Sequence, residues 1–142
     1  MKMIYTWTIE GQPVSMGRPR FNRRSGHCYT PRPTQEWQAY AVAKILDSKP
    51  AEAIERPCQL SVIAVFRRPK IINGRKPHHP GRVRHGAKPD ADNVLKQAGD
   101  CLERAGVLRN DSRIFDATVS KFYAAEGETP HTEIKLYVEN EI

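Results

Sequence analysis

A helix predicted over Asp90–Ala105 constrains the fold of this chain more than any other stretch. Its apolar residues recur at positions i, i+1, i+4, i+7, i+8 and i+11, which places them in one stripe along the helix. They are Val94, Leu95, Ala98, Cys101, Leu102 and Ala105. Gly106 is the expected stop of the helix. Because the stripe has to pack against another layer of structure, the sequence predicts a layered domain.

The start of the same helix carries two carboxylates, Asp90 and Asp92, and a lysine, Lys96, one turn further on. Two acids one residue apart can share a cation at a helix start, because the first of them is still extended. Clustered carboxylate oxygens suit a hard ion such as Mg²⁺, which serves phosphodiester hydrolysis. The simpler alternative is that Asp90 caps the helix while Asp92 and Lys96 form an ordinary surface ion pair.

A third carboxylate, Asp111, follows the helix in a polar turn beside the next predicted strand. This position is compatible with a meeting of Asp111 with Asp90 and Asp92. The residues alone favour the other interpretation, which is an Asx turn.

Two long stretches without acids precede these carboxylates. The first is a predicted loop, Ser15–Pro33, and no Asp or Glu lies between Glu10 and Glu36. Arginines interleaved with the aromatic residues Phe21 and Tyr29 are what a surface in contact with phosphates and bases needs. The alternative is a solvated loop with both aromatic rings tucked into the core. The candidate DNA contacts here are Arg18, Arg20, Arg23 and Arg24.

The second stretch, Arg67–Ala87, has no regular pattern, and no acid occurs from Arg56 through Pro89. A loop of this length is usually functional or disordered, and we predict an arm that orders on a nucleic-acid backbone. A zinc site is not favoured, because the three histidines of this stretch lack a nearby thiolate and the usual spacing. The candidate DNA contacts here are Arg67, Arg68 and Lys88.

The rest of the chain predicts four strands and a second main helix, with Thr34 as the N-cap of that helix. The strands are Met3–Ile9, Cys58–Phe66, Phe115–Ala124 and Thr132–Val138, and the helix is Thr34–Ser48. We expect the second strand to be buried and central, Phe115 to be partly buried, and the last two strands to form a hairpin. These elements predict one domain over residues 1–142, of the α/β (α+β) class, with two layers and a mixed four-stranded sheet.

Composition limits the partners and the compartment. A net charge of +7 and a pI near 9.5 favour polyanionic partners. The three cysteines, Cys28, Cys58 and Cys101, form no C-x-x-C pair, which is typical of reduced thiols. The sequence contains neither a signal-peptide pattern nor an apolar run of membrane-spanning length, so we expect a cytoplasmic protein.

At this point the residues resemble a known family. The pattern KPDxDNxxK over Lys88–Lys96, followed by a short helix, a glycine and the pair Asp111-Ser112, resembles the RusA-type Holliday junction resolvases. These are small, dimeric, Mg²⁺-dependent endonucleases that phages and prophages often carry. The resemblance is strong over Lys88–Ile114 and weaker over Gly11–Val14 and Gly17–Phe21, which look like the opening of the family.

The resemblance implies Asp90, Asp92 and Asp111 as metal-binding carboxylates and Lys96 as the catalytic lysine. It also implies a RusA-like homodimer that resolves four-way DNA junctions by paired symmetric nicks, in recombination and repair, since two strands need two active sites. Two alternatives stay open. One is a non-catalytic basic nucleic-acid-binding module, which needs no metal. The other is a metal nuclease acting on other branched DNA or on RNA, which only a substrate panel separates.

Overall fold

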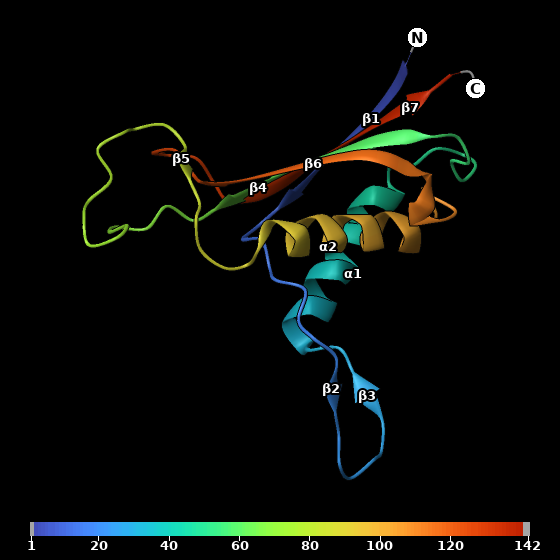
Figure 1. Cartoon of the computed structure of the whole chain (residues 1–142), viewed down its shortest axis with the longest axis horizontal. Helices are drawn as coiled ribbons and strands as arrows, with labels where there is room; N and C mark the ends of the chain where they lie inside the picture. Colours follow the sequence, from blue (N-terminus) through green and yellow to red (C-terminus); the bar gives the residue numbers. More distant parts are fainter. Residues whose placement is uncertain (1, 141–142) are drawn as a thin grey trace.

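A mixed five-stranded β-sheet forms one layer of the structure, and two helices cover one of its faces (Figure 1). The computed structural model describes residues 2–140. The sheet strands are β1 (Lys2–Glu10), β4 (Cys58–Phe66), β5 (Val83–Arg84), β6 (Ile114–Tyr123) and β7 (His131–Glu139). The helices are α1 (Arg32–Leu46), α2 (Ala91–Arg104) and a short 3₁₀ turn, η1 (Asp111–Arg113). The predicted two-layer α+β class, with two main helices, is confirmed.

The strand order is β1-β7-β4-β6-β5, and the predicted hairpin of the last two strands is wrong. β4 lies between β6 and β7, parallel to the first and antiparallel to the second. The chain reaches β6 from β4 through the crossover helix α2, which is the connection that a parallel pair requires. β4 takes the centre, as expected, and its residues are all buried or partly buried. The short strand β5 adds a fifth member at the edge beside β6.

The core lies between the sheet and the two helices. The apolar stripe of α2 is buried as predicted, except that Leu95 is only partly covered. Gly106, with φ of 77°, ends α2 where the sequence indicates. Phe115 was expected to be partly buried but is 57% exposed, because it belongs to a stretch of β6 that is largely exposed.

Helix α1 begins earlier than predicted, and Thr34 is not its N-cap. Pro31 occupies that position, and Pro33 lies in the first turn, where a proline is tolerated because it needs no backbone N–H partner. The Thr34 hydroxyl is buried instead, where it accepts from the Gly17 N–H at 2.9 Å and donates to the Ser15 carbonyl at 3.0 Å. Thr34 therefore ties the chain that follows β1 to the side of α1.

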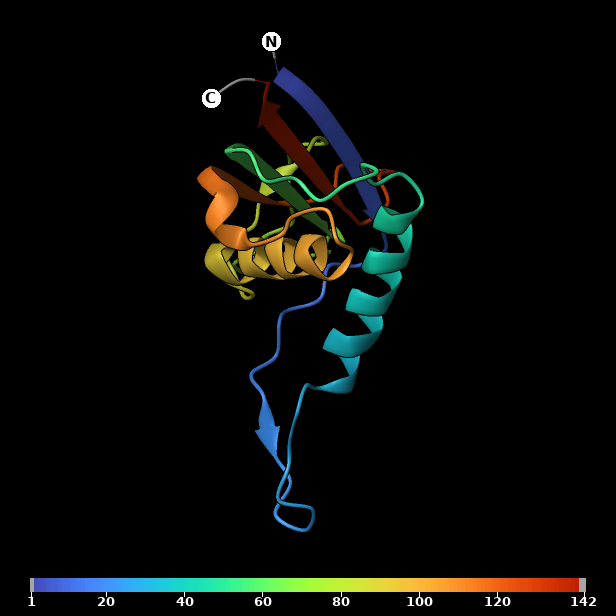
Figure 2. The ribbon, with the colours of Figure 1, turned by 90° about the vertical axis from the view of Figure 1, so that its right-hand side faces the viewer.

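The predicted loop Ser15–Pro33 contains a small hairpin made of β2 (Arg20–Phe21) and β3 (Cys28–Tyr29). We call Arg20–Tyr29 the basic hairpin. It projects away from the body of the molecule, beyond the N-terminal end of α1 (Figures 1 and 2). Its rings are not tucked into the core, since Phe21 is 62% and Tyr29 is 46% exposed.

All three cysteines are free thiols. Burial raises the pKa of Cys58 to about 11 and that of Cys101 to about 12, whereas Cys28 is exposed on the basic hairpin. Within residues 2–140, no helix combines the length and the apolar character needed to cross a membrane.

Candidate active site

The N-terminal end of α2 brings the first three predicted site residues into one pocket. Asp90 is the last extended residue before the helix, Asp92 lies in the first turn, and Lys96 lies one turn further on. All three line a pocket of about 410 Å³, which we call the α2 pocket. Its opposite wall comes from the chain just before the basic hairpin, including Met16 and Arg18.

Amide side chains hold the two walls of the α2 pocket together. The Asn93 side chain accepts from the Met16 N–H at 2.8 Å and donates to the Met16 carbonyl at 2.9 Å. One turn on, Gln97 donates to the Val14 carbonyl at 2.8 Å and accepts from the buried Gln38 amide at 2.9 Å. Sequence reasoning missed these residues. The available signal was Gln97 itself, a polar residue beside the apolar stripe of α2.

The carboxylates of Asp90 and Asp92 have no protein partner within residues 2–140. Asp90 makes no side-chain capping bond to α2, and Asp92 forms no ion pair with Lys96. Asp90 therefore occupies the N-cap position, as the simpler alternative expected, but without a capping bond from its side chain, and the surface pair of Asp92 with Lys96 is not seen. Two unpaired carboxylates in one pocket are an oxygen-only donor set, which is the kind that Mg²⁺ prefers.

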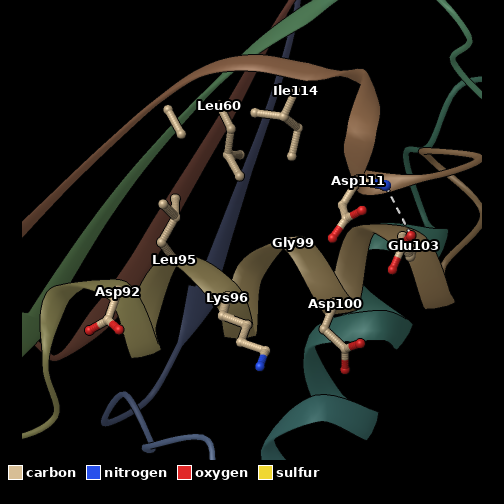
Figure 3. Close-up of a pocket in the computed structure, with 10 residues that line it drawn as sticks. Leu60, Asp92, Leu95, Lys96, Gly99, Asp100, Glu103, Asp111 and Ile114 are labelled. Atoms are coloured by element: carbon tan, nitrogen blue, oxygen red, sulfur yellow. Dashed lines mark hydrogen bonds between the residues drawn. The ribbon is translucent and has the colours of Figure 1, made fainter.

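Asp111, in η1, lies beside the C-terminal half of α2 and lines a separate groove (Figure 3). The groove has an apolar floor that includes Leu60 and Ile114, and Asp92 and Lys96 also line it. In Figure 3, Asp92 and Asp111 lie on opposite sides of Lys96.

The backbone N–H of Asp111 donates to Glu103 at 3.0 Å. Glu103 follows Asp92 by about three helical turns, or roughly 16 Å of helix. Among residues 2–140, no three His, Cys, Asp or Glu side chains lie close enough to hold one metal ion. The structure thus gathers Asp90, Asp92 and Lys96 but leaves Asp111 apart.

Asp111 does not form the Asx turn that the residues alone favour. The Asx-type contact is made by its neighbour Asn110, whose side chain accepts from the Ser112 N–H at 2.8 Å. The carboxylate of Asp111 has no hydrogen-bond partner within the described residues, so it remains available in the groove.

Five of the seven predicted DNA contacts are exposed side chains on or near the α2 pocket and the basic hairpin. Arg18 lines the α2 pocket, and Lys88 lies just before Asp90. Arg20, Arg23 and Arg24 lie on the basic hairpin. None of these side chains pairs with an acid in residues 2–140. They are therefore free to contact phosphate.

Of the other two predicted contacts, Arg67 is exposed, but Arg68 has a structural role. The Arg68 guanidinium donates to the carbonyls of His79, Gly81 and Ala124 at 2.5, 3.0 and 3.3 Å. These bonds fasten the base of the 67–87 loop to the edge of the sheet. The predicted arm is therefore anchored at its base, and it forms its own turn at Asn73 and Gly74, as the sequence indicates.

Lys121 fixes the chain that leads into the α2 pocket. Its ammonium donates to the carbonyls of Ala87 and Pro89, both at 2.7 Å, just before Asp90. Beside it, the buried His85 ring stacks against Phe66, with ring centroids 4.1 Å apart. Burial first, and the Lys121 charge second, lower the pKa of His85, so this histidine is a neutral packing residue.

Comparison with known proteins shows what kind of protein carries this pocket. The sequence model of the family described as "Endodeoxyribonuclease RusA" matches residues 10–137, which is most of the chain. The chain belongs to the RusA family of endodeoxyribonucleases. This confirms the resemblance drawn from Lys88–Lys96, and it makes the chain an endodeoxyribonuclease by family.

Two relatives match long parts of the chain. The crossover junction endodeoxyribonuclease RusA of Aquifex aeolicus is 28% identical over 110 residues, which span 77% of this chain and 74% of that protein. The uncharacterized protein YqaN of Bacillus subtilis is 30% identical over 136 residues, which span 92% of this chain and 93% of that protein. These coverages extend the likeness well beyond the α2 pocket.

Proposed function

We propose that this chain is a Mg²⁺-dependent Holliday junction resolvase, which cuts four-way DNA junctions by paired symmetric nicks in recombination and repair. Membership of the RusA family and the likeness to a crossover junction endodeoxyribonuclease support the reaction class. The observation that carries the assignment to a site is the pair of unpartnered carboxylates, Asp90 and Asp92, beside Lys96 in the α2 pocket.

In this proposal Asp90 and Asp92 hold the metal ion. Two carboxylates that share a pocket repel each other, and a divalent cation relieves that repulsion. A bound Mg²⁺ would supply charge stabilisation at the phosphate and a more acidic water. The α2 pocket opens to solvent at both acids, since both are exposed, which leaves room for a DNA phosphate to approach.

Lys96 and Arg18 have electrostatic roles. The ammonium of Lys96 faces the same pocket as both acids and has no acidic partner within residues 2–140, so it can stabilise negative charge developing on the phosphate. Arg18, on the opposite wall, can hold a neighbouring phosphate and fix the direction of the strand. Lys88 and the exposed arginines extend this contact, which predicts binding that weakens with salt.

A resolvase must cut two strands, and we propose a two-fold homodimer with one α2 pocket per chain. Asp111 is the third carboxylate of this proposal. Since Asp111 and Asp92 of one chain line opposite ends of a groove, we infer that Asp111 acts on the α2 pocket across the dimer. A second copy seated over that groove would cover its apolar lining, which includes Ile114 and Ala117.

The test of this function is cleavage of an end-labelled synthetic four-way junction beside a linear duplex with the same arm sequences, each with and without Mg²⁺. We expect paired nicks in the junction only, and only with metal. Tight junction binding with no cutting under any divalent ion would instead favour a non-catalytic binding module. A flap and an RNA junction in the same panel separate a nuclease of other specificity.

A further inference from the structure

The basic hairpin is stabilised by its own contacts rather than by the body of the protein. Its two strands pair Arg20 with Tyr29 and Phe21 with Cys28. At the tip, the Asn22 side chain accepts from the N–H groups of Arg24 and Ser25 at 2.9 and 3.3 Å. An isolated two-stranded hairpin is only marginally stable in water, so these internal bonds matter for its shape.

Every residue from Arg18 to Tyr29 is exposed, and this exposed surface combines positive charge with an aromatic ring. The charged side chains there are all arginines, and none has an acidic partner in residues 2–140. Phe21 is 62% exposed and packs against no core residue. Single exposed apolar residues are ordinary on a protein surface. This one lies on a projecting, purely cationic element, where the arginines attract a polyanion to the ring.

The strand geometry separates two surfaces of the hairpin. Successive side chains of a strand point to opposite faces, so Phe21 and Arg20 face opposite ways. Phe21 therefore shares its face with the small side chain of Cys28, which leaves the ring open on that side. Tyr29 lies on the other face, opposite Arg20.

We propose that the basic hairpin is a separate DNA-contact element in which Phe21 stacks on bases exposed at a branch point, while its arginines hold the adjoining phosphates. The inference rests on the proposed action on branched DNA and adds a residue that discriminates branched from linear DNA. Aromatic stacking on a base is sequence-tolerant, and it needs a base whose face is open. The interior of a linear duplex offers none, whereas a branch point offers several.

The residues that precede the hairpin place it next to the α2 pocket. The chain leaves the hairpin through Arg18 and Met16, both of which line that pocket. A branch point held by Phe21 would therefore lie within one short chain segment of the proposed metal ligands.

Equilibrium binding without divalent metal tests the proposal, because no cutting then occurs. Fluorescence anisotropy gives the dissociation constants of a four-way junction and of a linear duplex for the wild type, Phe21→Ala, Phe21→Tyr and Ile71→Ala. Ile71 is the matched control, since it is 63% exposed on the other projecting loop. Circular dichroism checks that the variants keep their fold.

We expect Phe21→Ala to weaken junction binding about tenfold, as the loss of one stacked base predicts, and to leave duplex binding unchanged. Phe21→Tyr keeps the ring and should bind the junction as the wild type does, and Ile71→Ala should change neither constant. Equal weakening on both DNAs, or no weakening on either, overturns the proposal and reduces the hairpin to a phosphate contact or a bystander.

The same experiment separates this proposal from the proposed function. If the wild type cuts junctions and Phe21→Ala keeps the full junction preference, the stacking role is wrong and the function stands. If the wild type neither cuts nor prefers junctions, the function fails, and binding to single-stranded DNA then decides the role of Phe21. A loss of single-strand binding in Phe21→Ala supports stacking, and wild-type binding overturns it.

Discussion

Asn93 and Met16 exchange two hydrogen bonds, which attach the chain that leads into the basic hairpin to the N-terminal end of α2. The Asn93 amide serves as both acceptor and donor to the Met16 backbone, at 2.8 and 2.9 Å. Asn93 is the residue that follows Asp92, so this contact lies next to a proposed metal ligand. The Asn93–Met16 contact would therefore link the part of the protein that holds DNA, the basic hairpin, to the part that holds the metal, the start of α2.

Replacing Asn93 tests that connection. Asn93→Ala leaves the Met16 N–H and carbonyl without their partners, which should cost about 1–3 kcal/mol of the free energy of unfolding. We expect junction cleavage to fall at least about tenfold, because a loosened hairpin root displaces Arg18 from the α2 pocket. Urea unfolding and cleavage assays measure the two effects.

The matched control for Asn93 is Gln12→Ala. Gln12 also accepts from a backbone N–H, that of Arg67 at 2.7 Å, but it does not line the α2 pocket. We expect this control to keep wild-type cleavage. Equal loss of cleavage in both variants would show that Asn93 acts through general stability alone.

Lys121 should matter for cleavage although it does not line the α2 pocket. Lys121→Met removes both bonds to the carbonyls of Ala87 and Pro89, and should release the chain that presents Asp90. We expect the Mg²⁺ concentration for half-maximal cleavage to rise about tenfold, a change of about 1.4 kcal/mol in metal affinity. Lys121→Arg should restore much of it by keeping a donor.

A Mg²⁺ titration of cleavage measures this effect, and Lys135→Met on β7 is the control for loss of a lysine in the sheet. An unchanged metal requirement in Lys121→Met would contradict the positioning role.

Acid should destabilise the fold partly through Glu128. Arg82 donates hydrogen bonds to this carboxylate at 2.7 and 3.1 Å and lowers its pKa from 4.5 to about 2. Because the pKa is lower in the folded state, the stabilisation is complete above about pH 4.5 and is lost as the pH falls toward 2. Glu128→Gln should therefore be less stable than the wild type at neutral pH.

Urea unfolding between pH 7 and pH 2 measures the effect. We expect the stability difference between the wild type and Glu128→Gln to shrink below about pH 4.5 and to approach zero near pH 2. Glu126→Gln, in the same turn, is the control and should track the wild type throughout. A difference that stays constant with pH would mean that the Arg82 contact does not set this pKa.

The proposed sharing of Asp111 across a dimer predicts complementation. Asp92→Asn and Asp111→Asn should each be inactive alone. When the two are mixed, about half of the dimers are mixed pairs, and each pair then holds one intact site and one doubly damaged site. We expect single nicks in the four-way junction from the mixture. No recovery after subunit exchange would place Asp111 in the site of its own chain or outside the site.

Local patterns in the sequence predict the elements around this site well. The stripe from Val94 to Ala105 predicts α2, since apolar residues at a 3.6-residue period indicate an amphipathic helix. The largely apolar stretch Leu60–Phe66 likewise predicts that β4 lies at the centre of the sheet. Asp90, Asp92 and Lys96 share a pocket because helical spacing alone puts them on the same end of α2.

Long-range pairing is what the sequence does not predict. Nothing within β6 or β7 indicates that β4 lies between them, because strand order depends on how α2 crosses the sheet. The partners of Asn93, Lys121 and Arg68 are backbone groups, which leave no residue-type signal. The distance of Asp111 from the other acids likewise depends on the full length of α2, which a local turn pattern does not contain.

The central claim is that the α2 pocket is the catalytic centre, and the most direct test is cleavage and binding of a four-way junction by Asp92→Asn. In Mg²⁺ this variant should lose cleavage yet bind the junction at least as tightly as the wild type, because it repels phosphate less. Glu52→Gln, an exposed acid outside the pocket, should cut normally. Wild-type cleavage by Asp92→Asn would contradict the account.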